Sequence, residues 1–177
     1  NVKTLADKKN IIKSKDNAFE LEMDITPNIA GVTGIELYNA KGENVKIYFD
    51  TKERKLVMDR TESGLIEFGK LSVPHDLEKN YADVHQGAGN TPFRVFNSVN
   101  YKNDFALGTW APLSLCKGKT YHVDIFVDKC SVEIFVDGGR IAMTNLVFPT
   151  TPYTSIKFYN KGTSASFHNI KISELSL

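Results

Sequence analysis

The chain has 177 residues, 41% of them hydrophobic and 24% charged, with a net charge of +1 at pH 7. This size and composition are typical of one soluble globular domain, and the balanced charge lacks the basic surplus of nucleic-acid-binding proteins. No window approaches eighteen consecutive apolar residues, and the first ten residues are not a signal peptide, so we expect neither nucleic acid nor a membrane among its partners.

Alternating apolar and polar residues dominate the sequence from Phe19 onward. The period of two runs through residues 19–25, 34–38, 44–50 and 120–128, and less cleanly through 155–160 and 169–175. Such alternation is typical of half-buried strands, and turn-forming residues separate the segments at short intervals. The pattern predicts an all-β fold, a two-sheet antiparallel β-sandwich of the jelly-roll or concanavalin A-like kind.

The segment from residue 74 to residue 112 has a different character. It mixes Gly, Asn and Pro with aromatic residues, which favours long loops with strands embedded between them. The chain contains no internal repeat, low-complexity tract or linker. We therefore expect residues 1–177 to form a single β-sandwich domain.

The stretch SVEIFVDGGR, residues 131–140, raises the possibility of a catalytic strand. Glu133 and Asp137 lie on the same face of a strand, roughly 13 Å apart by strand rise. That separation exceeds the roughly 5 to 9.5 Å between the two carboxyl groups of a glycosidase, so these acids form no catalytic pair. The stretch predicts a strand, an Asp-Gly-Gly turn and a return strand. Glu133 is then either a ligand contact or an ordinary residue of a hairpin whose apolar side chains face the core.

Two other groups of residues have the chemistry to bind a ligand. Asp59 and Arg60 end a predicted strand, and a guanidinium group can hold vicinal hydroxyls or a carboxylate. The alternative for this pair is a surface ion pair of little energetic weight. Tyr101, Asp104 and Trp110 combine aromatic rings with an acid, which is the composition of many sugar sites. The alternative for Trp110 is a large core residue.

The sequence predicts no metal and no cofactor. Its histidines show neither HxH nor HExxH spacing, and Asp83-Val-His85 alone is a weak metal motif. No Walker, GxGxxG or GxSxG segment occurs. We expect Cys116 and Cys130 to be free, mostly buried thiols. A bridge between them requires neighbouring strands with Cα atoms roughly 5.5 Å apart.

A family resemblance rests on three segments taken together. These are DKCSVEIFVDGGR (128–140), TNLVFPT (144–150) and, upstream, Asp59-Arg60-Thr61. Over residues 15–177 the chain resembles the C-terminal β-sandwich of glycoside hydrolase family 32, the invertases, inulinases and levanases that cleave β-fructosides. The Trp-Met-Asn-Asp-Pro-Asn-Gly, Arg-Asp-Pro and Glu-Cys segments of that family's catalytic propeller do not occur in this sequence. The resemblance therefore implies a non-catalytic accessory sandwich, excised from a longer chain whose five-bladed propeller lies N-terminal.

The resemblance also implies a ligand and a location. The chain is similar to carbohydrate-binding module family 66, whose members bind the terminal fructose of levan. Carried over to this sequence, Asp59, Arg60 and Glu133 become the expected fructose contacts, whereas Tyr101, Asp104 and Trp110 are expected from their chemistry alone. The expected partners are a fructan or fructose-terminated oligosaccharide and the chain's own propeller, in an extracellular or periplasmic setting.

Two other functions remain compatible with the sequence. One is a purely structural domain that stabilises the propeller, which predicts an exposed apolar patch on one sheet and would suit Phe126 and Phe135 on a nominally wet face. The other is an independent lectin or adhesion module of the laminin-G type with a ligand other than a fructan.

Overall fold

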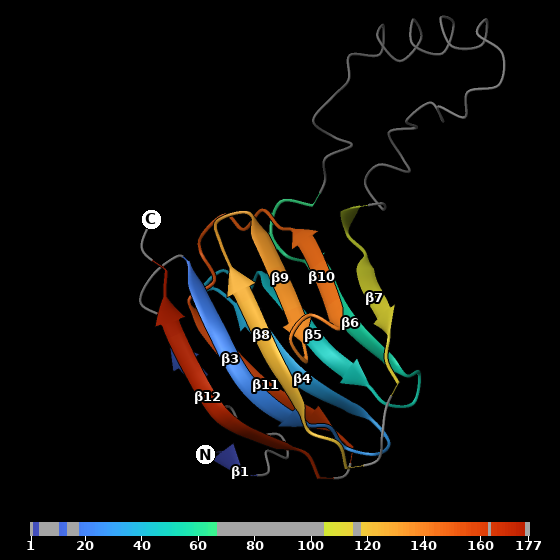
Figure 1. Cartoon of the computed structure of the whole chain (residues 1–177). Helices are drawn as coiled ribbons and strands as arrows, with labels where there is room; N and C mark the ends of the chain where they lie inside the picture. Colours follow the sequence, from blue (N-terminus) through green and yellow to red (C-terminus); the bar gives the residue numbers. More distant parts are fainter. Residues whose placement is uncertain are drawn as a thin grey trace, which may run out of the picture.

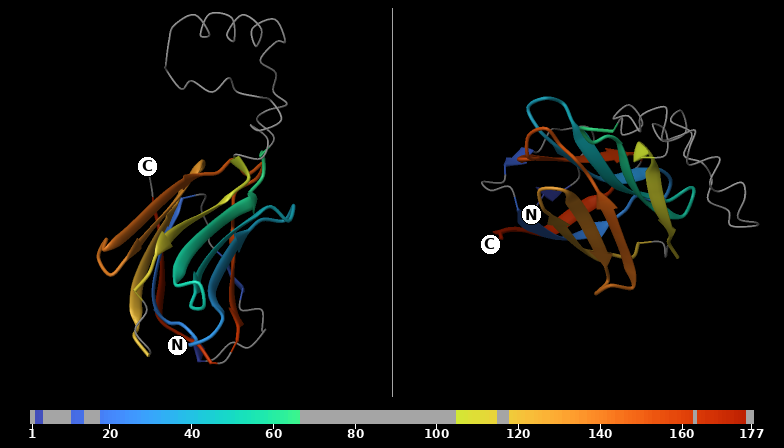
Figure 2. Two further views of the ribbon diagram at one scale, coloured as in Figure 1. Left: turned by 90° about the vertical axis from the view of Figure 1, so that its right-hand side faces the viewer. Right: turned by 90° about the horizontal axis from the view of Figure 1, so that it is seen from above.

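The computed structural model describes residues 2–3, 11–13, 18–66, 105–114, 118–162 and 164–175. The predicted antiparallel β-sandwich is confirmed, because these residues form two facing antiparallel sheets (Figures 1 and 2). Tyr101, Asp104 and Cys116 lie outside the described residues, as does most of the segment in which long loops were expected. Among the described elements there is no helix long and apolar enough to cross a lipid bilayer.

Sheet A contains six strands, and all of its neighbouring strands are antiparallel. In spatial order they are β1 (Val2–Lys3), β12 (Ser166–Glu174), β3 (Phe19–Thr26), β8 (Tyr121–Val127), β9 (Ser131–Val136) and β10 (Ile141–Leu146).

Sheet B also contains six antiparallel strands. Their order is β2 (Ile11–Lys13), β11 (Ser155–Lys161), β4 (Val32–Tyr38), β5 (Asn44–Asp50), β6 (Lys55–Glu62) and β7 (Gly108–Pro112). Strands β4 to β7 follow one another within sheet B, and β8 to β10 do so within sheet A. Consecutive strands in each run are therefore hydrogen-bonded neighbours, as Figure 1 shows.

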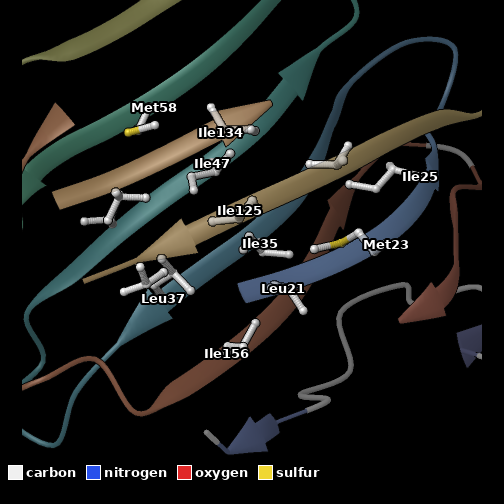
Figure 3. Close-up of a cluster of buried hydrophobic side chains, with 14 of the residues drawn as sticks. Leu21, Met23, Ile25, Ile35, Leu37, Ile47, Met58, Ile125, Ile134 and Ile156 are labelled. Carbon is white, nitrogen blue, oxygen red and sulfur yellow. The ribbon is translucent and has the colours of Figure 1, made fainter. Parts of the chain in front are cut away.

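The hydrophobic core lies between the two sheets. Inward-facing residues such as Leu21 and Ile125 of sheet A and Ile35 of sheet B belong to one buried cluster (Figure 3). Two aromatic pairs join the sheets across this core, Phe49 with Tyr121 at 5.3 Å and Phe158 with Phe167 at 5.0 Å between ring centroids. Burial of each large apolar side chain contributes about 1.5–3 kcal/mol. The period of two in the sequence therefore predicted the inward face correctly for residues 19–25, 34–38, 44–50 and 121–127.

The hairpin predicted at residues 131–140 is confirmed. Alternate residues of β9 are buried, so Glu133 points away from the core. Asp137 begins the turn with a positive φ of 50°, a conformation that short polar residues tolerate. Its carboxylate accepts hydrogen bonds from Lys119 Nζ at 2.5 Å and from the His122 amide at 3.1 Å, so Asp137 anchors the hairpin. Cys130, in the preceding turn, is free and exposed, so the expectation of a buried thiol is wrong for this residue.

Gly34 occupies a position in the middle of β4 that admits no side chain. It lies between Tyr159 of β11 and Tyr48 of β5 in the strand register. An added Cβ would stand 2.1 Å from the Ile47 carbonyl oxygen and 2.6 Å from the Tyr48 Cα. Both are backbone atoms, which cannot move aside without distorting β5. The missing side chain also lets the two tyrosine rings approach each other over β4, with centroids 6.3 Å apart.

We expect Gly34→Ala to destabilise the protein by about 1–3 kcal/mol, because the new methyl group overpacks against backbone. Gly108→Ala is the matched control, since its Cβ would meet only the Val57 Cγ1 at 3.8 Å. Its effect should stay within about 0.5 kcal/mol. Urea unfolding measures the free energy of unfolding of both variants. Equal stability of the two variants would contradict the prediction, because it would show that the β5 backbone can shift to accommodate the methyl group at little cost.

Candidate functional site

A groove of about 530 Å³ lies on the outer face of sheet B. Outward side chains of β4, β5, β6 and β11 line it, and Asp59 is among them. The groove therefore lies on the face opposite the core, where the register of the strands decides which side chains become neighbours.

The register arranges the outward residues of sheet B into three parallel rows that cross the strands. The central row consists of Tyr159, Gly34, Tyr48, Val57 and Trp110, one from each of five adjacent strands. Since directly opposite residues point to the same face, this row forms an apolar and aromatic floor.

Charged residues form the row on each side of this floor. One row runs Lys157, Glu36, Lys46 and Asp59, so positive and negative side chains alternate from strand to strand. The Lys157 Nζ lies 3.1 Å from the Glu36 Oε2 in an ion pair that this alternation creates. The row on the other side runs Lys161, Val32, Asp50 and Lys55.

Several polar atoms of the groove are not committed to other contacts. Within the part of the chain that the structure describes, neither the Tyr48 nor the Tyr159 hydroxyl forms a hydrogen bond. Burial raises the pKa of both tyrosines, so both hydroxyls stay protonated and can donate as well as accept. The Asp59 Oδ1 accepts from the Thr61 amide at 3.0 Å and from the Thr61 hydroxyl at 2.7 Å, which orients the carboxylate. Aromatic faces beside carboxylates, ammonium groups and hydroxyls suit a polyhydroxylated ligand.

Trp110 lies on the same face as the groove, at the end of the central row. Its side chain is 57% exposed, so the alternative of a core tryptophan is excluded. The Lys55 Nζ stands 4.6 Å from the indole centroid in a cation–π contact.

Arg60 points to the opposite side of β6 from Asp59, because adjacent residues of a strand face opposite ways. Its Nη1 donates a hydrogen bond to the Leu146 carbonyl at 2.9 Å, and its guanidinium carbon lies 4.2 Å from the Phe105 ring centroid. Burial lowers the pKa of Arg60. The side chain thus ties the end of β6 in sheet B to the end of β10 in sheet A.

Exposed leucines gather around Arg60. The Arg60 amide donates to the Leu107 carbonyl at 3.5 Å, and Leu107 and Leu146 are both about half exposed. Leu65 is exposed as well, and its amide bonds to the Phe148 carbonyl at 2.8 Å. Three exposed leucines, Leu65, Leu107 and Leu146, therefore cluster at one end of the sandwich, which differs from the patch on a sheet face that a purely structural role led us to expect.

Glu133 lies on the outer face of sheet A. Its cross-strand neighbours are Phe126 of β8 and Thr144 of β10, and the Phe126 and Phe135 rings pack at 5.8 Å. Asp59 and Glu133 are therefore on opposite outer faces of the sandwich, with Arg60 at its end. The structure does not bring the three residues expected to contact fructose into one site, and the role of each stays a prediction.

A second polar cluster occupies sheet A near its centre. His122 is bracketed by two carboxylates, with its Nδ1 at 2.9 Å from the Asp24 Oδ1 and its Nε2 at 3.1 Å from the Asp124 Oδ1. Among the described residues, ligand atoms of Glu22, His122 and Asp124 lie within 4.8 Å of one another, close enough to share a cation. The imidazole Nδ1 hydrogen-bonds to Asp24, and a protonated ring would also place its Nε2–H against the Asp124 carboxylate.

Sequence reasoning missed both the aromatic row and the cluster around His122. Each combines strands that are far apart in the chain, and only their register brings the residues together. The acids alternating in 19–25 and 121–127 gave a partial signal, since two such segments form a polar face wherever they pair. Tyr48 and Tyr159 gave no sequence signal of a binding site, because outward-facing tyrosines are common in strands.

Comparison with known proteins gives consistent matches. The family described as "Glycosyl hydrolases family 32 C terminal" matches residues 1–174. The chain is 36% identical over 95 residues to a levanbiose-producing levanase of Bacillus subtilis (strain 168), covering 54% of this chain but 17% of that protein. It therefore spans only a small part of that relative's length.

Two solved structures share the fold. Exo-inulinase from Aspergillus awamori aligns with a TM-score of 0.63 at 20% identity, over 98% of this chain and 28% of that one. Galectin LEC-6 from Caenorhabditis elegans aligns with a TM-score of 0.57 at 11% identity, over 98% of this chain and 95% of that one. At these identities the likeness shows the sandwich fold alone.

The cluster around His122 should make stability depend on pH. The hydrogen bond between His122 and Asp24 raises the pKa of the imidazole, and it is also the main reason why the pKa of Asp24 is lowered. The histidine's stabilisation is complete below its unfolded pKa of about 6.5 and is lost as the pH rises through the folded pKa. The stabilisation from Asp24 is complete above its unfolded pKa of about 3.9 and is lost as the pH falls through its folded pKa.

We therefore expect His122→Gln to cost most stability between about pH 4 and 6.5 and least near pH 9. The loss should not exceed about 1 kcal/mol, because the His122 side chain is 50% exposed. Urea unfolding at pH 5.5 and at pH 9 measures the two differences. A loss that is the same at both pH values, or larger at pH 9, would contradict the assignment of a protonated His122.

Proposed function

Because the chain belongs to the C-terminal domain family of the family 32 glycosyl hydrolases, we propose that it is the non-catalytic β-sandwich of a β-fructosidase. In this role it supports the catalytic propeller and binds terminal fructose units of levan or inulin. An extracellular or periplasmic setting, which the family resemblance implies, is part of the same proposal.

The observation that carries the binding proposal is the groove on sheet B. It combines the Tyr48 and Tyr159 rings, two uncommitted phenolic hydroxyls and the oriented Asp59 carboxylate. A fructose unit offers several adjacent hydroxyls and an apolar ring face, so it can stack on one tyrosine while its hydroxyls meet the charged rows. Asp59 is also one of the residues that the family resemblance selected independently.

The proposal that the chain is non-catalytic is supported by the positions of Asp59, Glu133 and Asp137, the acids that the sequence singles out as candidates. Retaining and inverting glycosidases need two carboxyl groups on either side of one bond, roughly 5 to 9.5 Å apart. Asp59 and Glu133 are on opposite faces of the sandwich, and the two carboxylate oxygens of Asp137 accept hydrogen bonds from Lys119 and from the His122 amide of β8. These acids therefore do not form such a pair.

Support of a propeller rests on the apolar end of the sandwich. Leu65, Leu107 and Leu146 expose apolar surface around Arg60 and offer a contact for a second domain.

The alternative is an independent lectin with a non-fructan ligand. The groove chemistry alone suits many sugars, and the sandwich fold occurs in a galectin that this chain aligns with almost end to end. A glycan panel that includes levan, inulin and galactosides separates the two functions. Hits confined to sugars without fructose would favour the lectin.

Replacing Asp59 tests the site. We expect Asp59→Asn to weaken binding of levan or inulin about tenfold or more, because hydrogen bonds to a charged group contribute about 1.5–3 kcal/mol. Isothermal titration calorimetry with each polymer measures the effect, and Glu174→Gln serves as the control at an exposed acid on β12.

Glu133→Gln belongs in the same series. If Glu133→Gln abolishes binding while Asp59→Asn binds as the unsubstituted chain does, the site lies on sheet A. That result would contradict the proposal that the groove on sheet B is the binding site. The unsubstituted chain should release or absorb binding heat with at least one polymer. If calorimetry detects no binding heat with levan or inulin at a millimolar concentration of terminal fructose units, the binding role is overturned altogether.

A further inference from the structure

The aromatic row on sheet B is longer than the groove. The groove's lining reaches β6 at Asp59, but the central row continues through Val57 to Trp110 on the edge strand β7. Tyr48, Val57 and Trp110 are directly opposite one another in register, so their side chains share one face without interruption.

The length of this row exceeds what one sugar ring can cover. Neighbouring strands lie about 4.8 Å apart, so Tyr48 and Trp110 are separated by roughly 10 Å and Tyr159 and Trp110 by roughly 19 Å. Each step of the row is a direct cross-strand pair, so the row continues from strand to strand and turns gradually with the twist of the sheet. An elongated ligand can therefore lie along it.

Trp110 has the properties of a contact at the far end. The indole is 57% exposed, and its N–H donates no hydrogen bond within the described residues. The Lys55 Nζ, 4.6 Å from the ring centroid, adds a cation beside the aromatic surface. A large indole held on a strand in this exposed state costs hydrophobic free energy, which a stacked ligand would recover.

The two charged rows flank this line on both sides. Lys46 and Asp59 lie on one side of the line, and Asp50 and Lys55 lie on the other, on the same two strands, β5 and β6, as Tyr48 and Val57. The ring faces of a ligand would therefore contact the floor, and hydroxyl groups at the ring edges would meet carboxylates and ammonium groups on β5 and β6, whereas Gly108 and Pro112 flank Trp110 on β7.

We propose that sheet B binds a stretch of several fructose units laid across the strands, with Trp110 as a contact remote from the groove. This inference rests on the proposed fructan binding and specifies its ligand as a chain segment rather than a single terminal unit. The Tyr48–Tyr159 groove holds one unit, and the units that follow pass over Val57 to the indole.

Affinity as a function of chain length tests this inference. Calorimetry with fructose, sucrose and fructo-oligosaccharides of increasing length should show an affinity that rises until the ligand reaches Trp110 and then levels off. Because Trp110 is the only tryptophan in the chain, its fluorescence reports contact directly. We expect the emission to change with the longer oligosaccharides and not with fructose.

Two variants locate the effect. Trp110→Ala should lower the affinity for the long oligosaccharides about fivefold and leave sucrose binding unchanged, since only the remote stacking contact is lost. Leu146→Ala is the matched control, because Leu146 is similarly exposed, at 53%, on the edge strand of sheet A. It should bind all ligands as the unsubstituted chain does.

The outcomes separate this inference from the function on which it rests. Binding that is equally strong for sucrose and for long oligosaccharides, or unaffected by Trp110→Ala, would overturn the extended site and leave terminal fructose recognition standing. The absence of binding to every fructose-containing ligand would overturn both.

Discussion

Burial of one face of each sheet is the constraint on which the rest of the molecule depends. Every strand must direct alternate side chains into the space between the sheets, and a slip of one residue would exchange its inner and outer faces. The aromatic pairs Phe49–Tyr121 and Phe158–Phe167 fix the two sheets against each other within this core. Once the inner residues are set, the outer ones have no freedom in their placement, and the register alone decides which of them are neighbours.

The two outer faces therefore acquire different chemistry from the same rule. On sheet A the pairing of β3 with β8 places acids around His122, and the result is a polar cluster that we expect to make stability depend on pH. On sheet B the pairing across β4 places Tyr48 and Tyr159 on either side of a glycine, and the result is an open aromatic floor between charged rows. Gly34 is the residue that makes the second arrangement possible, because a side chain there would collide with the backbone of β5 beside Tyr48.

The amino-acid pattern was sufficient to predict most of the fold and little of the site. Period-two alternation identified the sandwich and the 131–140 hairpin, since each depends only on residues close in the chain. It also showed that Glu133 and Asp137 are no catalytic pair. The expected grouping of Asp59, Arg60 and Glu133 did not form, because adjacent residues of a strand diverge and Glu133 belongs to the other sheet. Tyr48 and Tyr159 could not be found from the sequence, since their proximity depends on two separate strand pairings.

The most direct measurement is the mapping of NMR chemical-shift changes during titration with a fructo-oligosaccharide. Binding along the aromatic row predicts changes at the rings of Tyr48 and Tyr159, at the Trp110 indole N–H and at the backbone of β5 and β6, with sheet A left unchanged. Changes centred on Glu133, Phe126 and Phe135 would place the ligand on the opposite face and contradict the site on sheet B.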